Sequence, residues 1–277
     1  MPELPEVDLV ARSLHSLVCG RTIVAAELLR ERLAPENTSA EFAAKLANSR
    51  IGAVNRRGKH ILIGLENGRT LIVHLRMSGR FVLIDSEVEP PKFTHAIFRL
   101  DDSRKLIFSD QRHFGLMKLV ETADLKSAKE LAKLAPEPFS EEFSLSYFRD
   151  RLSRSSRSLK EFLLDQTQVC GLGNIYAAEA MFAANIHPAV PANSVGPVKA
   201  RRLHESIRAV LDEAIRHNLG RPVDPEDLEG SYFSGSGTTG WYVYDREGEP
   251  CSFCATAIVR LKQGGRSTYF CRRCQRK

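Results

Sequence analysis

Long apolar runs are missing from this sequence. No stretch approaches the run of about 20 apolar residues that a membrane-spanning helix needs, so we expect no membrane partner. The opening MPELPEVDLV carries acids where an export signal would carry basic residues. We therefore expect a cytoplasmic protein, in which disulfide bonds are disfavoured.

The excess of positive charge is small but uneven. A hydrophobic content of 43% and a charged content of 27% are ordinary for a globular chain, and the net charge is +6. Residues 260–277 contain no acid, and they carry Arg260, Lys262, Arg266, Arg272, Arg273, Arg276 and Lys277. Such a segment favours a polyanionic partner through phosphate contacts, although a solvated tail would have the same composition.

The cysteines fall into two groups. Cys19 and Cys170 stand alone in apolar surroundings, which is typical of small buried side chains. The other four form the pairs CSFC and CRRC, with the ligands Cys251, Cys254, Cys271 and Cys274. Two CxxC pairs in a chain without an export signal predict one structural Zn²⁺ held by four thiolates; disulfides are the alternative.

The first half of the chain has the pattern of an antiparallel β protein. Residues 4–18 have helical spacing, and SAEFAAKLANSR predicts a second helix. Between residues 21 and 120, HILIGL, RTLIVHL, RFVLI, HAIFRL and KLIFSD are short strand-like runs separated by turns. We predict a β-sandwich or barrel with flanking helices.

Beyond residue 121 the periodicity becomes helical. ADLKSAKELAKL, SLSYFRDRL, SLKEFLLDQT, NIYAAEAMFAANI and KARRLHESIRAVLDEAIRHNL all predict helices, and residues 219–240 predict a loop. The fold class is therefore α+β. We predict a β domain over residues 1–133, a helical domain with the loop over 134–240, and a zinc finger with a β-hairpin over 241–277.

The N-terminus offers a nucleophile. Removal of Met1 would expose the secondary amine of Pro2, which at a pKa near 8 is partly unprotonated and can attack an aldehyde-level carbon. Glu3 and Glu6 lie beside it and could transfer protons or stabilise an iminium ion. The alternative is that Pro2 merely begins a helix whose dipole the two glutamates favour.

Three strings together carry a resemblance. PELPEV at 2–7, GLGNIYAAEA at 171–180 and the paired CxxC motifs closely resemble the bacterial formamidopyrimidine-DNA glycosylase family in order and spacing. The resemblance covers the whole chain. It implies a bifunctional glycosylase and AP lyase of base excision repair, which removes oxidised purines from damaged double-stranded DNA. One nucleophile and one cleft per chain need no partner subunit, so we expect a monomer, and its DNA would bring it to the bacterial nucleoid.

The resemblance assigns roles to particular residues. It makes Pro2 the Schiff-base nucleophile, Glu3 a proton donor, Glu6 a second acid, and Lys59 of RRGKH a catalytic and phosphate-holding cation. GLGNIYAAEA matches the helix–two-turn–helix motif, with Asn174 as a phosphate ligand. In the zinc hairpin, the string GGRSTYFC makes Arg266 a DNA contact.

An enzyme that flips a nucleotide out of a duplex must fill the gap. The resemblance assigns this to Met77 in HLRMSG and to Arg112 and Phe114 in DQRHFG, and it lets His74 approach a phosphate. From the residues alone, Met77 and Phe114 would be core side chains at strand ends.

The sequence departs from the family in one loop, and alternatives to the oxidised-purine glycosylase have to be weighed. The loop at 219–240 cannot be matched residue by residue to the family's lesion-covering loop, which leaves the lesion preference open. Preference for oxidised pyrimidines, as in the endonuclease VIII branch, is one alternative, but Leu4 stands where that branch has glycine. A non-catalytic damage sensor and a zinc-ribbon RNA-binding protein are two others. The presence of Pro2, Glu3 and Lys59 disfavours the damage sensor.

Overall fold

The computed structural model describes residues 1–219, 224–225 and 240–277. The predicted loop at 219–240 thus lies mostly outside the described residues. The chain forms two compact units. The first contains Met1–Ala132 and the residues from Asn218 onward that end the long helix, and the second contains Lys133–His217 and the C-terminal segment. No helix of the described residues is long and apolar enough to cross a membrane.

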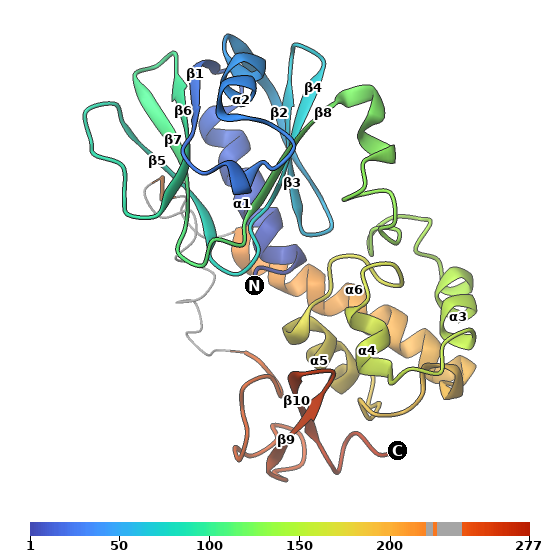
Figure 1. The fold of residues 1–277 in the computed structure, drawn as a ribbon. Coiled ribbons are helices and arrows are strands. Elements are labelled where there is room, and N and C mark those ends of the chain that lie inside the picture. The colour runs from blue at the N-terminus through green and yellow to red at the C-terminus, as the bar shows by residue number, and fades with distance from the viewer. Residues whose placement is uncertain (220–223, 226–239) are drawn as a thin grey trace. The chain divides into compact units, whose positions relative to one another are not determined.

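The first unit is built on antiparallel strands (Figure 1). Its helices are α1 (Leu4–Val18), the 3-10 helix η1 (Glu31–Leu33), α2 (Ser39–Leu46) and the 3-10 helix η2 (Thr122–Ser127). Its strands are β1 (Thr22–Leu28), β2 (Ser49–Arg57), β3 (His60–Leu65), β4 (Arg69–His74), β5 (Gly79–Asp85), β6 (Thr94–Leu100), β7 (Arg104–Asp110) and β8 (Leu116–Glu121).

The eight-stranded sheet has the order β5-β7-β6-β1-β2-β3-β4-β8. Every pairing in it is antiparallel, and most of the strands that pair are also consecutive along the chain. β1 and β2 pair only at Thr22–Arg50 and Ile23–Ser49, so the sheet turns a corner there and divides into two four-stranded halves. The predicted antiparallel sheet is confirmed.

The predicted helix over residues 123–134 is wrong. The chain forms only η2 there, followed by turns. None of the side chains of η2 is buried, so no apolar stripe holds a longer helix in place. The Ser127 hydroxyl also donates to the Asp124 carbonyl at 2.8 Å, a local bond that competes with α-helical hydrogen bonding.

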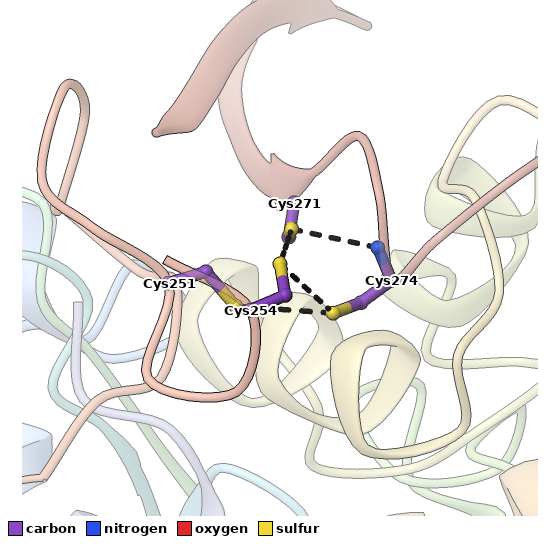
Figure 2. Close-up of side chains that lie close together, drawn as sticks. All are labelled: Cys251, Cys254, Cys271 and Cys274. Atoms are coloured by element: carbon purple, nitrogen blue, oxygen red, sulfur yellow. Dashed lines mark hydrogen bonds between the residues drawn. The ribbon is translucent and has the colours of Figure 1, made fainter. Parts of the chain in front are cut away.

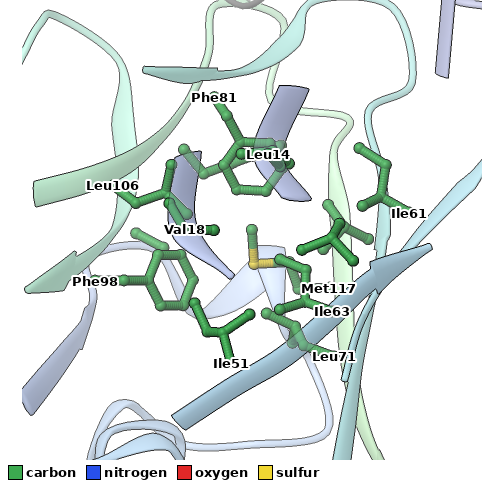
Figure 3. Packing of buried hydrophobic residues seen from close by; sticks show 14 of the residues in the cluster. Leu14, Val18, Ile51, Ile61, Ile63, Leu71, Phe81, Phe98, Leu106 and Met117 are labelled. Carbon is green, nitrogen blue, oxygen red and sulfur yellow. The ribbon is translucent and has the colours of Figure 1, made fainter. Parts of the chain in front are cut away.

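Helix α1 supplies the centre of the core. Its apolar positions recur every three or four residues, and Leu4, Val7, Val10, Leu14 and Val18 are buried. Figure 3 shows Leu14 and Val18 among side chains from both halves of the sheet, which include Phe81, Phe98, Leu106, Ile51, Ile61, Ile63, Leu71 and Met117. Burial of such side chains contributes about 1.5–3 kcal/mol each, so α1 is firmly held.

The second unit is helical. It contains α3 (Leu145–Ser153), α4 (Leu159–Leu164), α5 (Asn174–Ala183), the 3-10 helix η3 (Ala192–Ser194), most of α6 (Pro197–Leu219), and the hairpin β9 (Ile258–Gln263) and β10 (Arg266–Cys271). Ser144 and Ser158 cap α3 and α4, because their hydroxyls accept the N–H groups of Tyr147 and Glu161. The predicted helical half and zinc-finger hairpin are confirmed.

Gly79 begins β5 at a point where no side chain fits. A Cβ there would lie 2.5 Å from the Leu75 carbonyl oxygen and 2.7 Å from Cζ of Phe108. We expect Gly79→Ala to lower the free energy of unfolding by about 1–3 kcal/mol, since backbone must shift to relieve the overlap. Gly196→Ala is the matched control, because its Cβ would meet nothing within 4 Å. Equal midpoints for the two variants in urea unfolding would contradict this packing.

Two histidines pack in the first unit with their rings edge to face at 4.7 Å, His60 at the start of β3 and His74 at the end of β4. Burial lowers the pKa of His60 to about 4 and that of His74 to about 2. Both rings are therefore neutral near pH 7.

These two half-buried rings predict that the protein loses stability in acid. The unfolded chain, with a His pKa near 6.5, takes up protons before the folded chain does, so stability is complete above about pH 6.5 and falls as the pH falls toward about 4. His60 alone should cost about 2 kcal/mol between about pH 6.5 and about pH 5. Urea unfolding at these two pH values should show a smaller loss for His60→Gln than for the unchanged chain; an equal loss would refute the assignment.

Candidate active site and nucleic-acid interface

The N-terminal amine lies among charged groups. Burial lowers the pKa of the Met1 amine, the carboxylates of Glu3 and Glu6 oppose that shift, and the cations Lys59 and Arg112 add to it. Glu3 is 3% exposed and Lys59 is 5% exposed, so both act in a poorly hydrated environment. Four of the predicted site residues are thus brought within electrostatic reach of one amine.

The first turn of α1 fixes the two acids. The Glu6 carboxylate accepts the backbone N–H of Glu3 at 2.8 Å, which caps the helix. Pro5 lies in the first turn, where a missing N–H costs nothing. Pro2 precedes this turn and is buried. Removal of Met1 would therefore leave the amine on a residue whose position α1 determines.

Lys59 is presented by the tight turn between β2 and β3. Gly58 has a φ of 57°, and Arg57 pairs with His60 across the turn. Arg56 donates to the Gly58 carbonyl at 3.2 Å and lies 3.5 Å from the Asp8 carboxylate of α1. The turn that carries the lysine is therefore tied to the helix that carries the acids.

Met77, Arg112 and Phe114 lie on loops at the ends of strands. Met77 is 39% exposed and Phe114 is 52% exposed, so the core alternative for these two side chains is wrong. The Arg112 guanidinium lies 5.3 Å from the centre of the Phe114 ring. An exposed thioether, a planar cation and an exposed aromatic ring are suited to entering a base stack.

Asp110, which the sequence analysis missed, connects these two loops. Its carboxylate is 1% exposed and accepts the Ser78 hydroxyl beside Met77, the Arg112 N–H at 3.1 Å and the Gly115 N–H at 2.7 Å. Burial raises the pKa of Asp110, but these hydrogen bonds together lower the pKa by more than burial raises it, so the net shift is downward. Asp110 ends β7 and is the first residue of DQRHFG, and an acid at this position was the available signal.

His74 lies at the end of β4. Its Nδ1 accepts the backbone N–H of Arg76 at 3.0 Å, which bends the chain toward Met77. The structure therefore gives His74 a role in the shape of this loop.

In the second unit, Asn174 is the first residue of α5 and follows Gly173. Its Oδ1 is buried and has no hydrogen-bond partner among the residues that the structure describes. Gly171, with a φ of 85°, lets the chain turn into the helix, and Gln166 holds this turn through the Gly171 N–H at 3.0 Å. The N-terminus of a helix favours an anion, and Asn174 stands at that end of α5.

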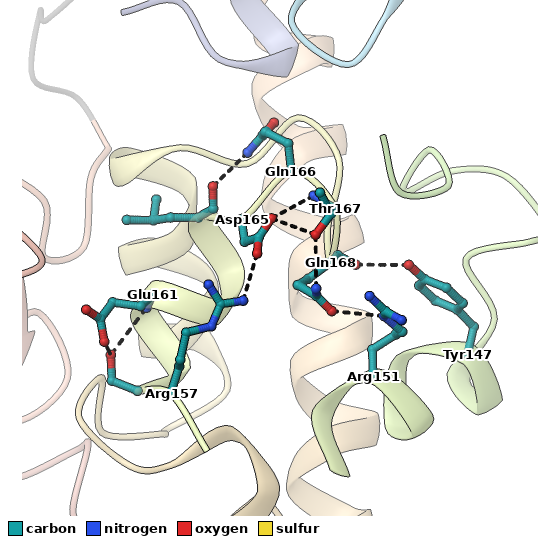
Figure 4. Close-up of polar contacts among 10 residues, drawn as sticks. Tyr147, Arg151, Arg157, Glu161, Asp165, Gln166, Thr167 and Gln168 are labelled. Carbon is teal, nitrogen blue, oxygen red and sulfur yellow. Dashed lines mark hydrogen bonds and ion pairs between the residues drawn. The ribbon is translucent and has the colours of Figure 1, made fainter. Parts of the chain in front are cut away.

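A polar network stabilises the segment that leads to this turn (Figure 4). Asp165 accepts the Arg157 guanidinium at 2.7 Å and the Thr167 N–H at 2.9 Å. Gln168 receives the Arg151 guanidinium at 2.9 Å on its side chain and the Tyr147 hydroxyl at 3.3 Å on its carbonyl. These contacts connect α3 and α4 to the loop before α5.

The four predicted zinc ligands meet in one cluster (Figure 2). Their sulfur atoms all lie within 4.8 Å of one another, and the Cys254 sulfur lies 3.5 Å from those of both Cys271 and Cys274. Tetrahedral Zn–S bonds of about 2.3 Å require sulfur separations of this size. The donor set therefore fits one structural zinc ion, and four protein ligands leave it no open position.

The zinc hairpin turns at Gly264 and Gly265, whose φ values are 53° and 76°. Arg266 follows directly, as the exposed first residue of β10. A buried acid that the sequence analysis missed, Glu179 of α5, accepts the N–H groups of Tyr242, Val243 and Tyr244 at 2.8–3.0 Å. A lone acid in the apolar run NIYAAEAMFA was the signal for this anchor.

Three family models match most of the chain. Residues 1–117 match the formamidopyrimidine-DNA glycosylase N-terminal domain, residues 134–221 its H2TH domain, and residues 248–276 a zinc finger found in FPG and IleRS. Formamidopyrimidine-DNA glycosylase of Pelotomaculum thermopropionicum is 40% identical over 100% of this chain and 99% of its own length. That of Bacillus subtilis is 39% identical over 100% of both.

Solved structures agree with these relatives. The Lactococcus lactis formamidopyrimidine-DNA glycosylase bound to AP-site DNA has a TM-score of 0.89 at 32% identity and covers 99% of this chain and 100% of its own. The same enzyme bound to N7-benzyl-Fapy-dG DNA has a TM-score of 0.90 at 33% identity and covers 100% of both chains. With these full-length matches and the site geometry, the chain belongs to the formamidopyrimidine-DNA glycosylase family.

Proposed function

We propose that this protein is a bifunctional DNA glycosylase and AP lyase of base excision repair that removes oxidised purines, including formamidopyrimidines and 8-oxoguanine, from duplex DNA. The observation that carries the proposal is the group formed by Glu3, Glu6 and Lys59, which act electrostatically on the N-terminal amine of Met1. Removal of Met1 would place the secondary amine of Pro2 next to the same groups, and an unprotonated secondary amine is a nucleophile. The names of the full-length relatives support the same activity.

The chemistry begins once Met1 is removed. The lone pair of the Pro2 nitrogen attacks C1′ of the damaged nucleotide, and the bond from C1′ to the base nitrogen breaks, with its electron pair leaving on the base. The departing base takes up the proton that the Pro2 nitrogen loses, Glu3 donates a proton to the ring oxygen as the sugar ring opens, and an iminium cation forms between the Pro2 nitrogen and C1′. Loss of a C2′ proton then expels the 3′ phosphate, and a second elimination expels the 5′ phosphate.

Neighbouring charges assist these steps. The Glu6 carboxylate stabilises the iminium cation, and Lys59 holds a phosphate beside the sugar. Met77, Arg112 and Phe114 enter the duplex where the nucleotide has left it, and Asn174, Arg266 and His74 contact the backbone. The exposure of Met77, Phe114 and Arg266 and the place of Asn174 at the N-terminus of α5 support these assignments.

We assign a separate role in this reaction to each of the three predicted domains. We assign the chemistry to residues 1–133, backbone binding to 134–240 and a zinc-stabilised contact to 241–277. The Lactococcus lactis relative has been crystallised with abasic-site, Fapy-dG and oxidised-pyrimidine DNA, so both lesion classes belong in the test. We place the protein on chromosomal DNA in the bacterial cytoplasm.

Borohydride trapping tests the proposal directly. Purified protein, with Met1 removal verified by mass spectrometry, is incubated with duplexes that carry 8-oxoguanine, an oxidised pyrimidine or an abasic site. A covalent adduct that maps to Pro2 and forms faster on the purine lesion supports both mechanism and substrate. An adduct mainly on the pyrimidine lesion keeps the mechanism and changes the substrate. No adduct on any duplex rejects the enzyme.

Two substitutions test the roles of the nucleophile and of the proton donor separately. Pro2→Gly replaces the secondary amine and should lower trapping by about tenfold or more, while DNA affinity stays nearly unchanged. Glu3→Gln should slow base excision by about 10²-fold or more but spare binding of abasic DNA, because only proton transfer is lost. Glu66→Gln, a half-exposed acid on the β3–β4 turn, is the control. Full excision activity in either site variant would refute its role.

Zinc should support DNA binding without taking part in chemistry. Cys254→Ser removes one thiolate, so the metal content should fall and DNA affinity should fall with it. Cys19→Ser is the control, since its Sγ only donates to the Gly52 carbonyl at 3.1 Å and a hydroxyl can do the same. Elemental analysis and fluorescence anisotropy measure the two effects. Normal DNA affinity in the zinc-free variant would exclude the hairpin as a DNA contact.

A further inference from the structure

A groove of about 410 Å³ lies in the second unit between α3 and the start of α6. One wall is the face of α3 from Ser146 to Ser153, and the other is the segment from Asn193 of η3 to Pro197, the first residue of α6. We call it the α3–α6 groove. Figure 1 shows α3 on one side of this unit and the hairpin β9–β10 on the other. The volume of the groove lies in the range of ordinary ligand sites.

Hydrogen bonds hold both walls of the groove in place. The Asn193 N–H donates to the carbonyl of Ser155, which follows α3, at 2.9 Å. The Nε2 atom of His204 on α6 lies 2.7 Å from the carbonyl of Phe143 just before α3, and the two rings stack with their centres 4.9 Å apart. The groove is therefore formed before a partner binds, which lowers the entropic cost of binding.

Apolar side chains lie in the groove and beside it. Leu152 and Val195 line it, and Leu152 is 2% exposed, so it forms part of the floor. Val198, in the first turn of α6, directly follows Pro197 of the wall. It is 80% exposed, more than any other large apolar side chain that the structure describes. The groove and its rim thus offer an apolar surface to another molecule.

Four cations surround this apolar surface. Arg149 lines the groove, and Lys199, Arg201 and Arg202 follow in the first two turns of α6. All four are exposed, and none forms an ion pair or a side-chain hydrogen bond within the part of the chain that the structure describes. Cations near the N-terminus of a helix oppose its dipole, so the stability of α6 does not account for them.

The acids near the groove leave its charge positive. Asp150 lines the groove but pairs with Arg154 at 2.6 Å. The sequence has no acid from residue 180 to residue 204. Glu205 lies one turn beyond Arg201, and no ion pair joins the two within the described residues. The charge of the groove is therefore complementary to that of an acidic ligand.

We propose that the α3–α6 groove binds a short acidic segment of a partner protein that also carries apolar side chains. Its carboxylates pair with the guanidinium groups of Arg149, Arg201 and Arg202, a geometry that suits two-pronged hydrogen bonds. Its apolar side chains pack on Val195 and Val198. A DNA backbone would satisfy the cations but would leave the apolar surface exposed, so a peptide fits the groove better. This inference does not rest on the proposed function.

Fluorescence anisotropy with the full-length protein tests the groove. The probe is a fluorescein-labelled peptide in which two leucines stand among six aspartates, and a peptide of aspartates alone is the comparison. We expect saturable binding of the leucine peptide at low salt. Arg149→Gln combined with Arg201→Gln should weaken it about tenfold, because two exposed charge pairs are lost. Val198→Thr should weaken it about threefold and leave the aspartate peptide unaffected, because only apolar contact is lost.

Two controls match these variants. Arg216→Gln removes an exposed cation from the other end of α6, and Val24→Thr changes an exposed valine on β1. Neither should change the affinity for either peptide. Equal melting temperatures for all variants establish that the substitutions leave the fold intact. A loss of binding in Arg216→Gln as large as that in the groove variant would show unspecific charge attraction and reject the groove.

The remaining outcomes decide between a peptide and DNA. No saturable binding of the leucine peptide, or equal binding by the unchanged protein and the two-arginine variant, overturns the proposal. Undamaged duplex DNA is titrated in parallel, and we expect the two-arginine variant to bind it and to trap abasic DNA like the unchanged protein. A loss of DNA affinity as large as the loss of peptide affinity assigns the cations to DNA and rejects the peptide. Peptide binding is measured without DNA, so failure of the glycosylase reaction leaves this test intact.

Discussion

The burial of α1 between the two halves of the sheet is the constraint on which the candidate active site depends. Leu4, Val7 and Leu14 are at most 1% exposed, so the helix cannot slide without opening the core. A slip of one residue would move the N-terminus by about 1.5 Å, and an error of about 1 Å at a reacting centre can cost 10²-fold in rate. The core thereby fixes the amine, Glu3 and Glu6 at once.

One buried carboxylate in each of the two units holds surface segments of that unit in place. Asp110 holds the loops of Met77 and Phe114 through hydroxyl and backbone donors, and Glu179 holds Tyr242–Tyr244 through three N–H groups. Burying a charge is costly unless it is hydrogen-bonded, and each of these acids receives several bonds. Burial is the largest influence on the pKa of both, yet the net shift is downward at Asp110 and upward at Glu179.

Side-chain spacing was enough to predict several elements and the metal site. The apolar period of residues 4–18 predicted α1, since a helix of that length must bury a stripe. The two CxxC pairs predicted the zinc cluster, because few ions other than zinc need four thiolates at that spacing. The helix predicted over 123–134 failed for the converse reason: its period was present, but Ala128 and Leu131 are its only buried apolar residues, which is too little buried apolar surface to hold a helix of that length.

By itself the sequence determined most of the local elements and the zinc ligands, and through resemblance it predicted the residues of the reaction. These depend on near neighbours or on motifs whose spacing the chain carries. Only the tertiary structure decided that Met77 and Phe114 are exposed, that Asp110 and Glu179 are anchors, and that Arg149 and Val195 line one groove. The reason is physical: exposure and pairing between distant residues follow from how strands and helices pack, which periodicity along the chain does not encode.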